Sequence, residues 1–360
     1  MKIAQVAPLY ESVPPQRYGG TERVVSYLTE ALVDLGHDVT LFASGDSVTK
    51  ARLVPQCRSG LRLDLTCKDP LAYHVRMIER VFQQGADFDI IHFHLDHLQY
   101  PQARRHGGQH LTTLHGRLDL PETEALFQEF REMSVVAVSD AQREPLRWLN
   151  WLGSVHHGVP ERLYELHGDA GSYLAFIGRM SPEKRVDHAI ATALATGIPL
   201  KIAAKVDRAD REYFEREIEP LLAHPLIEFI GEIGDAEKGE FLGNALALLF
   251  PIDWPEPFGM VMIEAMACGT PVVATRCAST PEVIDNGLSG FLVDRSDGVE
   301  GLVRGVERAV YLDRRGVREV FERRFTAERM ALEYQSIYAR MCRPALVPEV
   351  IREAVAFDGI

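Results

Sequence analysis

The chain of 360 residues is 46% hydrophobic, and its 52 acidic and 39 basic residues give a formal net charge of −13. The length fits two α/β domains with large cores, while the negative charge argues against a global affinity for nucleic acid or anionic lipid. Its five cysteines, Cys57, Cys67, Cys268, Cys277 and Cys342, show no C-x-x-C spacing, which favours reduced thiols in a cytosol over a disulfide framework or a structural zinc.

Strand-like apolar runs alternate with helix-like segments along the whole chain. The first residues already form a strand pattern without a signal-peptide layout, and no run approaches the roughly 18 apolar residues that span a bilayer. This alternation predicts parallel sheets covered by helices on both faces. The predicted strands are 2–7, 38–43, 88–93, 109–114, 134–138, 154–157, 172–178, 199–204, 226–230, 246–250, 271–275 and 290–293. The predicted helices are 21–35, 70–84, 121–131, 141–150, 183–196, 208–222, 236–244, 258–268, 279–285, 298–312 and 326–342.

A small, polar stretch, Gly168–Ser172, divides this pattern into two halves, and a fresh strand follows it. We therefore predict two doubly wound domains, 1–167 and 168–325, facing each other across a cleft. Open α/β sheets bind ligands at the carboxyl ends of their strands, so motifs that follow strands are the candidates for a site.

Two glycines, Gly19 and Gly20, precede the first predicted helix. Without Cβ atoms they allow the backbone to approach a phosphate closely, although a plain tight turn explains them equally well. The stretch is not G-x-G-x-x-G, so the dinucleotide fingerprint is absent.

Histidines follow the next strands of the N-terminal half. His92, His94 and His97 resemble a metal cluster, since the first two share a strand face. Structural packing is favoured for these histidines and an acceptor contact is the next alternative, so no metal site is predicted. His115 ends a later strand before a glycine, and this position predicts a place in the cleft.

An amphipathic, partly basic segment lies between residues 143 and 152, with Arg143, Arg147, Trp148 and Trp151. Such a segment suits a membrane surface or a lipid-linked acceptor, but packing of a helix is the favoured interpretation.

In the second half, a strand ends at Arg179 and a helix is predicted to start after Ser181, with Pro182 at its first position. Arg179 and Lys184 would then converge on one anion, the arginine as a fork and the lysine as a point charge. The alternative is a pair of solvated surface cations.

Glu256 and Glu264 have seven residues between them and flank a small-residue helix start. Pro257 suits the first helical position, which would leave the N–H groups of Phe258–Met260 free to bind an anion such as a diphosphate. Carboxylates beside an anion site are tolerated when they accept hydrogen bonds from hydroxyls. The stretch therefore predicts a ligand that is a phosphorylated sugar.

Residues 256–272 resemble the E-P-F-G-x-x-x-x-E-A-M-A-x-G-T-P-V signature of the family 4 retaining glycosyltransferases. The resemblance covers most of the chain and is strongest over 172–293. It implies the GT-B fold, with two Rossmann-like domains and a last helical segment, 326–360, that crosses back onto the N-terminal domain. The chain departs from the family at Cys277–Thr280, where Gly-Gly is common, and Glu282 is interpreted as a structural residue at a helix start.

The resemblance also implies roles for single residues. Arg179 and Lys184 would clamp the leaving diphosphate, His115 and Glu256 would contact hydroxyls of the transferred sugar, and Glu264 would hold the ribose hydroxyls. The glycine pair would contact the donor's diphosphate or the acceptor, and the main chain of Ile233 would face the base. The implied catalytic residues are His115, Arg179, Lys184 and Glu256. The implied donor-binding residues are Gly19, Gly20, Ile233, Phe258, Gly259, Met260 and Glu264.

The resulting expectation is a retaining glycosyltransferase that moves a sugar from a UDP- or GDP-sugar to an unknown sugar, lipid-linked or small-molecule acceptor. It would form an α-linkage without a metal or other cofactor, by a front-face route in which the leaving phosphate takes the acceptor's proton. The expected location is cytoplasmic, with peripheral membrane association left open. The alternatives are a sugar-nucleotide epimerase or a sugar phosphorylase on the same fold, or a non-catalytic sugar-nucleotide sensor.

Overall fold

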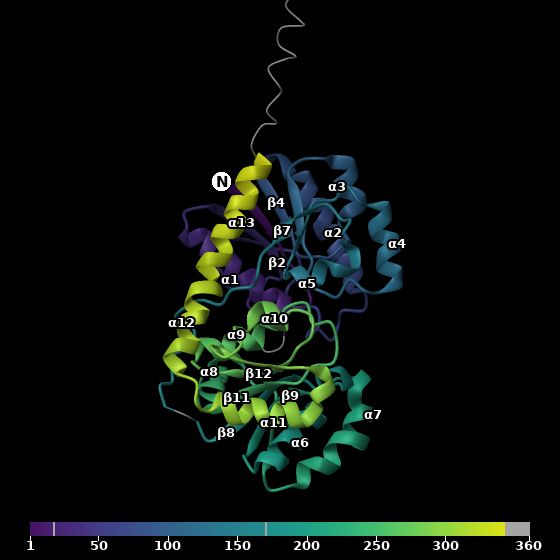
Figure 1. Ribbon diagram of the computed structural model, residues 1–360. Coiled ribbons are helices and arrows are strands. Elements are labelled where there is room, and N and C mark those ends of the chain that lie inside the picture. Colours follow the sequence, from purple (N-terminus) through teal and green to yellow (C-terminus); the bar gives the residue numbers. More distant parts are fainter. Residues whose placement is uncertain (17–18, 170, 343–360) are drawn as a thin grey trace, which may run out of the picture.

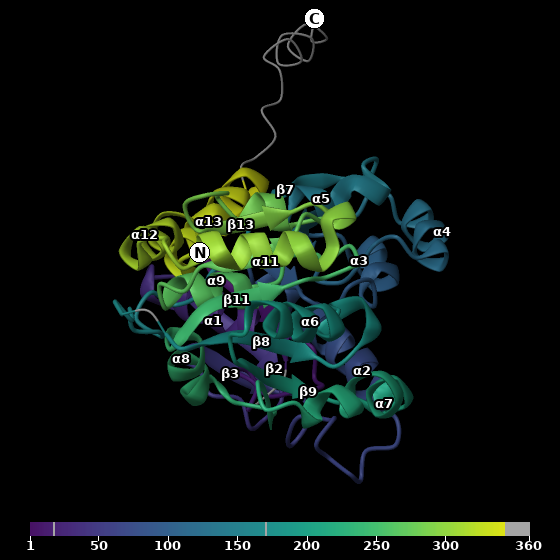
Figure 2. The ribbon, with the colours of Figure 1, turned by 60° about the horizontal axis from the view of Figure 1, so that its bottom comes forward.

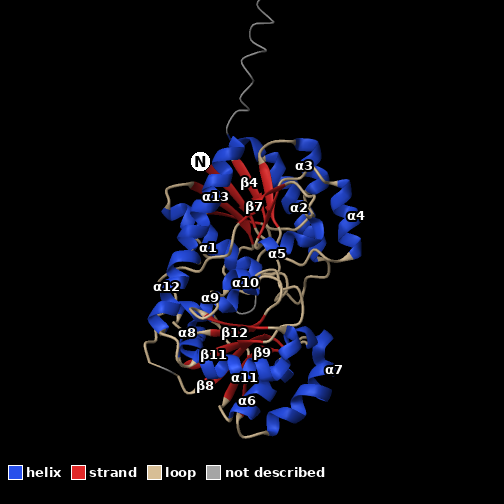
Figure 3. Cartoon of the chain, in the orientation of Figure 1, coloured by secondary structure: helices blue, strands red, loops and turns tan. Residues whose placement is uncertain are grey.

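The computed structural model describes residues 1–16, 19–169 and 171–342. The chain forms two lobes, each with a parallel sheet inside and helices outside (Figures 1 and 3). Within the described part of the chain, no helix has the length and apolar character needed to cross a membrane. The predicted pair of doubly wound parallel sheets is confirmed.

The N-terminal sheet has seven strands in the order β3-β2-β1-β4-β5-β6-β7. Ile3 of β1 pairs with Val39 on one side and Ile90 on the other, so the strand order reverses between β1 and β4. Such a switch point opens a crevice at the carboxyl ends of the strands. The strands are β1 (Lys2–Val6), β2 (Asp38–Ala43), β3 (Arg52–Pro55), β4 (Ile90–Phe93), β5 (His110–Thr113), β6 (Val135–Ala137) and β7 (Trp151–Ser154). The helices of this lobe are α1 (Gly20–Asp34), α2 (Pro70–Gln83), α3 (Tyr100–His106), α4 (Pro121–Glu129) and α5 (Asp140–Arg143).

The C-terminal sheet has six strands in the order β10-β9-β8-β11-β12-β13, with its switch point between β8 and β11. Its edge strand β10 is followed by α8, whose start faces the N-terminal lobe through an ion pair with Arg23. The strands are β8 (Tyr173–Arg179), β9 (Leu200–Lys205), β10 (Ile227–Gly231), β11 (Ala245–Phe250), β12 (Val272–Thr275) and β13 (Gly290–Val293). The helices are α6 (Val186–Thr196), α7 (Arg211–Tyr213), α8 (Asp235–Gly243), α9 (Met260–Ala267), α10 (Thr280–Val283), α11 (Gly298–Ala309) and α12 (Arg314–Arg324).

The chain returns to the N-terminal lobe through α13 (Ala327–Cys342), which packs along α1 (Figures 1 and 2). Tyr334 and Tyr338 of α13 are fully buried there. Residues 343–360 of the predicted crossing segment lie outside the described residues, and the boundary at 167/168 stays a prediction.

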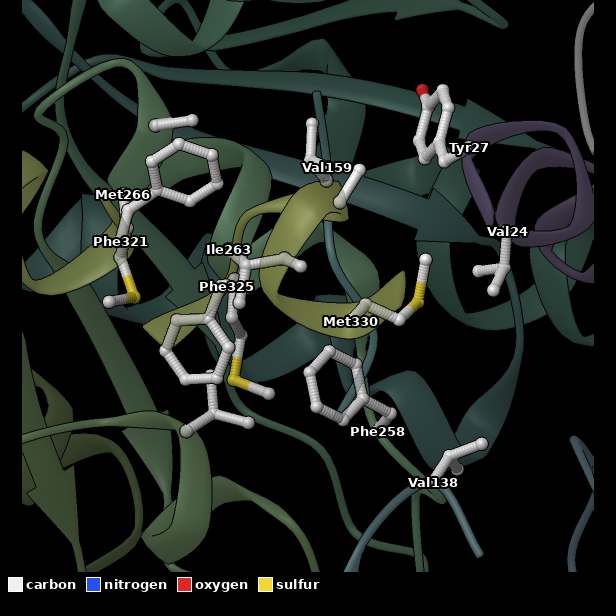
Figure 4. Close-up of a cluster of buried hydrophobic side chains, with 14 of the residues drawn as sticks. Val24, Tyr27, Val138, Val159, Phe258, Ile263, Met266, Phe321, Phe325 and Met330 are labelled. Atoms are coloured by element: carbon white, nitrogen blue, oxygen red, sulfur yellow. The ribbon is translucent and has the colours of Figure 1, made fainter. Parts of the chain in front are cut away.

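One apolar core runs through both lobes near the crossing. Figure 4 shows Val24 and Tyr27 of α1 close to Met330 of α13, with Phe258, Ile263 and Phe325 beside them. The two lobes therefore share buried surface, which fixes how their strand ends face each other.

Several elements differ from the sequence-based predictions. Strand β3 and helices α3 and α12 were not predicted, because they are short or follow another helix closely. The predicted helix 141–150 is wrong: α5 ends at Arg143, a 3-10 turn, Glu144–Leu146, contains Pro145, and β7 starts at Trp151 instead of residue 154. Pro145 has no N–H to continue the helical hydrogen bonds.

Two further helices are interrupted. In the predicted helix 208–222, a π-helical turn, Phe214–Ile218, gives way to a 3-10 turn, Glu219–Ala223, which has Pro220 as its second residue. In the predicted helix 183–196, Pro182–Lys184 form a 3-10 turn behind Ser181, and Arg185 adopts a left-handed conformation, φ 52°, before α6.

Candidate active site

A cleft of about 700 Å³ lies between the carboxyl ends of the two sheets. Its N-terminal wall follows β1, β4 and β5, and its C-terminal wall follows β8, β9, β10 and β11. Both switch points therefore open into the same space, and the volume is typical of a pocket for a ligand of drug or cofactor size.

Every residue that the sequence analysis assigned to the site lines this one cleft. The N-terminal wall holds Gly19, Gly20 and His115, and the C-terminal wall holds Ile233 after β10. The rest of the C-terminal wall includes Arg179, Lys184, Glu256, Phe258, Gly259, Met260 and Glu264.

The cations of the C-terminal wall are held by carboxylates. Arg179 contacts the Glu183 carboxylate, and its Nε lies 3.4 Å from Oδ2 of Asp210. Lys184 instead contacts Glu256, which also accepts a hydrogen bond of 3.1 Å from Nε1 of Trp254. Arg179 and Lys184 thus line the same cleft but form ion pairs with different carboxylates. An anion bound between them would compete with these carboxylates for the two cations.

Helix α9 begins at Met260, two residues after the start of the predicted helix 258–268 and three after Pro257, the predicted first helical position. Pro257 and Phe258 belong to the preceding loop, and Gly259 is the N-cap with φ 84° and ψ 69°, so Pro257 is not the first helical residue. A Cβ atom on Gly259 would lie 2.8 Å from Cε of Met262, so glycine is required by both its torsion angle and its neighbours. Helix geometry leaves the N–H groups of Met260 and Val261, both in the cleft wall, without intrahelical partners.

Glu264 lies one helical turn further and is only 2% exposed. Nζ of Lys238 lies 2.9 and 3.0 Å from its two carboxylate oxygens, and Lys238 also approaches Oδ1 of Asp235 at 3.4 Å. A ligand hydroxyl that reaches Glu264 therefore meets a carboxylate already compensated by a lysine.

On the N-terminal wall, His115 and His94 are directly linked. Nε2 of His115 lies 2.9 Å from Nδ1 of His94, and the His115 ring stacks on His157 with 5.4 Å between centroids. Burial lowers the pKa of His115 to about 3, so the ring is neutral at physiological pH. A neutral imidazole suits a hydrogen bond to a hydroxyl.

The other histidines of this wall divide into two roles. His92 is fully buried between Tyr338 and Thr113 and does not reach the cleft, whereas His94 and His97 line it. The described residues contain no group of three or more His, Cys, Asp or Glu side chains placed to hold a metal ion.

The structure bears on two further interpretations from the sequence. Glu282 lies in the first turn of α10, as predicted, and its carboxylate also accepts hydrogen bonds from the N–H groups of Asp140 and Ala141 at the start of α5, in the other lobe. The segment 143–152 is a turn followed by an edge strand, in which Nε1 of Trp151 donates to the carbonyl oxygen of Leu146 at 2.9 Å.

Several cleft residues escaped the sequence analysis. Tyr10, Arg62 and Asp96 come from loops after β1, β3 and β4, and Lys205 ends β9. Arg62 follows a strand that was not recognised, and its partner Glu11, at 2.9 Å, lies 51 residues away in sequence. Such a pair is recognised only from the folded structure, because no local sequence pattern connects its two residues.

Two protein families match parts of the chain. The family described as "Glycosyltransferase Family 4" matches residues 18–192, and "Glycosyl transferases group 1" matches residues 165–323. The two matches overlap over residues 165–192, which extend into the C-terminal lobe, and together they support a glycosyltransferase of the family 4 type.

Individual proteins agree with this result. A phosphatidyl-myo-inositol mannosyltransferase of Mycolicibacterium smegmatis is 28% identical over 342 residues, covering 85% of this chain and 84% of the relative. The structure of AviGT4, a glycosyltransferase involved in avilamycin A biosynthesis, superposes with a TM-score of 0.74 at 25% identity, over 95% of this chain and 98% of that chain. A sucrose-phosphate synthase from Thermosynechococcus elongatus shares the fold, with a TM-score of 0.77 at 19% identity, over 95% and 99% of the two chains.

Proposed function

The chain is a glycosyltransferase with the GT-B fold, and from this premise we propose that it transfers a sugar from a UDP- or GDP-sugar to an acceptor hydroxyl. The anomeric configuration of the donor would be retained, giving an α-linkage, and no metal would be required. The observation that carries this proposal is the gathering of every predicted site residue in one cleft between the two switch points.

Charge supports this assignment. Cleavage of the bond between sugar and diphosphate builds negative charge on the leaving group, and Arg179, Lys184 and the start of α9 line the wall where it would lie. Loss of one such preorganised group costs ~10²–10³ in rate in well-studied enzymes. The same cations would take the place that a divalent metal has at other diphosphate sites.

Hydroxyl groups would be bound on both sides of the reaction centre. Glu256, held by Lys184 and Trp254, would accept hydrogen bonds from the transferred sugar, with His115 opposite. Glu264 would accept those of the ribose, and Ile233 would meet the base through its main chain. No side chain is assigned as nucleophile, which favours a front-face route, and in that route the leaving phosphate would take the acceptor's proton.

The acceptor would bind at the N-terminal wall, beside Tyr10, Arg62 and His97. Because the Mycolicibacterium relative is named for mannose and phosphatidyl-myo-inositol, we include a mannosyl donor and a membrane-presented cyclitol among the candidates. A cytoplasmic location, with peripheral association at a membrane, is part of the proposal. The five cysteines, all unpaired, are compatible with a reducing compartment.

The first test measures thermal stabilisation of the protein by UDP, GDP, ADP and their sugar conjugates. A ligand that binds the folded state raises the melting temperature with its concentration over Kd. We expect one nucleotide series to stabilise the wild type and to lose its effect on Arg179→Ala, while Arg211→Ala, an exposed control on α7, keeps it. No shift with any nucleotide at millimolar concentration would contradict the proposal.

Product analysis separates the alternatives. The stabilising donor is incubated with and without myo-inositol or phosphatidyl-myo-inositol vesicles. Transfer that depends on acceptor supports the proposal, and an α-linked product supports retention. Isomerisation of the donor without acceptor would indicate an epimerase. Release of a sugar phosphate on addition of inorganic phosphate would indicate a phosphorylase, and binding without turnover would indicate a sensor.

A further inference from the structure

A buried chain of hydrogen bonds leads from the cleft into the N-terminal lobe. It starts at His115, passes through His94 and continues to Gln5 in the centre of the sheet. Nδ1 of His94 lies 2.9 Å from Nε2 of His115, and Nε2 of His94 lies 2.8 Å from Oε1 of Gln5. Gln5 is fully buried and His94 is 2% exposed, so water does not substitute for these contacts.

The chain of hydrogen bonds extends to α13. Nε2 of Gln5 donates to the Tyr338 hydroxyl at 3.2 Å, and that hydroxyl lies 2.7 Å from Nδ1 of His92. His92 in turn lies 2.7 Å from the Thr113 hydroxyl, which lies 2.8 Å from that of Tyr334. The side of the sheet behind the cleft is therefore closed by two tyrosines from the returning helix.

The protonation of the two central rings follows from this arrangement. Burial lowers the pKa of His94 well below its usual value, as it does for His115, so both rings are neutral. A neutral imidazole has one N–H donor and one acceptor nitrogen. Oε1 of Gln5 only accepts, so His94 donates through Nε2 and its Nδ1 must accept. His115 therefore carries its proton on Nε2.

We propose that Gln5 and His94 are positioning residues for sugar transfer, which hold the His115 ring and keep its proton on Nε2, so that Nδ1 accepts a hydrogen bond from a hydroxyl in the cleft. The functional half of this inference rests on the proposed transferase activity. His157 stacks on the His115 ring, with an interplanar angle of 20°, and limits its rotation. Fixing one ring tautomer in advance spares the enzyme a rearrangement when the donor binds.

The tautomer is measured on the protein alone. Long-range ¹H–¹⁵N correlation spectra of histidine-labelled protein distinguish Nε2–H from Nδ1–H rings, and the His115 signals are identified by their absence in His115→Asn. We expect the Nε2–H pattern for His115 without any ligand. An Nδ1–H pattern, which the reversed orientation of the Gln5 amide would give, or a mixture of the two overturns the inference.

The kinetic consequence is tested with a matched pair at His94. The oxygen of an asparagine takes the place of Nδ1 and can still accept from His115, whereas the amide of a glutamine takes the place of Nε2 and reaches only Gln5. We expect His94→Asn to keep kcat within about 5-fold of wild type. His94→Gln should lower kcat about 10²-fold with little change in donor KM, and should lose the single tautomer of His115.

The two variants each remove one hydrogen bond, so their melting temperatures should fall by similar amounts. Equal kcat losses in both would indicate a merely structural role and would overturn the inference. If either variant does not fold, the spectrum of the wild type still decides the tautomer. A failure of nucleotide binding would reject the proposed function and leave the spectrum as the test of the histidine chain.

Discussion

Three buried histidines, His92, His94 and His157, share the property that the folded protein keeps them neutral. Burial is the largest cause that lowers the pKa of each far below its usual value near 6.5. Their rings lie in a column that reaches from Tyr334 to Phe258, with His115 in its middle. The unfolded chain binds protons on these groups at a pH where the folded chain does not.

Acidification should therefore destabilise the protein. The pKa values of these histidines are lowered in the folded state, so above about pH 6.5 both the folded and the unfolded chain hold them neutral and the free energy of unfolding is not reduced. As the pH falls from about 6.5 toward the pKa values of the folded state, the free energy of unfolding decreases by about 1.4 kcal/mol per pH unit for each group. We expect the melting temperature to fall between pH 6.5 and 5, and less steeply in His157→Phe, which removes one such group. The control His224→Asn, at an exposed position, should follow the wild type. Identical pH dependence in all three proteins would contradict this account.

At this scale, the chemistry of single residues could be predicted and their partners could not. The residue types and spacing around Arg179, Lys184 and Glu256 indicated a site for a phosphorylated sugar. Lys184 contacts Glu256 and Lys238 covers Glu264 because turns and helices that follow different strands meet in space. Because such contacts link positions far apart in sequence, no local pattern encodes them.

Among the elements, α9 depends most on one residue at its start. Gly259 has a left-handed conformation, which costs another residue about 1–2 kcal/mol, and an added Cβ would also lie 2.8 Å from Met262 and 3.0 Å from Phe250. We expect Gly259→Ala to lower the melting temperature and to weaken stabilisation by the nucleotide. The comparison is Gly287→Ala, with φ 85° and no atom within 4 Å of the added Cβ, which isolates the backbone cost. If Gly259→Ala lowers the melting temperature no more than Gly287→Ala does, the side chains of Met262 and Phe250 move aside and add no cost.

Element type was predictable where periodicity was long and ends were marked. For α2, Pro70 at the first position and Asp69, whose carboxylate accepts from the N–H groups of Leu71 and Ala72, mark the start in the sequence itself. The helix over 141–150 failed because an amphipathic pattern was followed through Pro145 into a strand. The start of α9 failed because Pro257 fits a helix start in isolation, whereas the conformation of Gly259 moves that start.

For the whole molecule, Glu282 connects the two lobes. Burial would raise the pKa of this carboxyl, but hydrogen bonds from His156 and from the N–H groups of Asp140 and Ala141 outweigh it, and the pKa is lowered. Ser139 adds a hydrogen bond of 2.6 Å to the carbonyl oxygen of Pro257, in the loop before α9. The lobes are thus joined directly beside the candidate donor site.

Removal of this carboxylate should loosen the arrangement of the lobes. Glu282→Ala leaves the N–H groups of exposed Asp140 and half-buried Ala141 without their acceptor, and a typical intramolecular hydrogen bond contributes about 0.5–1.5 kcal/mol. We expect a lower melting temperature and a small-angle scattering curve that changes more on addition of nucleotide than that of the wild type. Glu300→Ala, an exposed acidic residue of α11, serves as the control. Scattering and melting equal to this control would refute the coupling.

The return of α13 to the first lobe also sets an order of assembly during synthesis. The last strand of the N-terminal sheet ends at Ser154, and α13 begins at Ala327, about 170 residues later. At 5–20 residues per second, a ribosome needs roughly 10 to 35 s to deliver that helix. Throughout this delay, Gln5, His92 and Thr113 lack the tyrosine hydroxyls that close their hydrogen-bond chain. The lobe that is synthesised first is therefore completed last. The hydrogen-bond chain behind His115 is closed only after the entire second lobe has emerged.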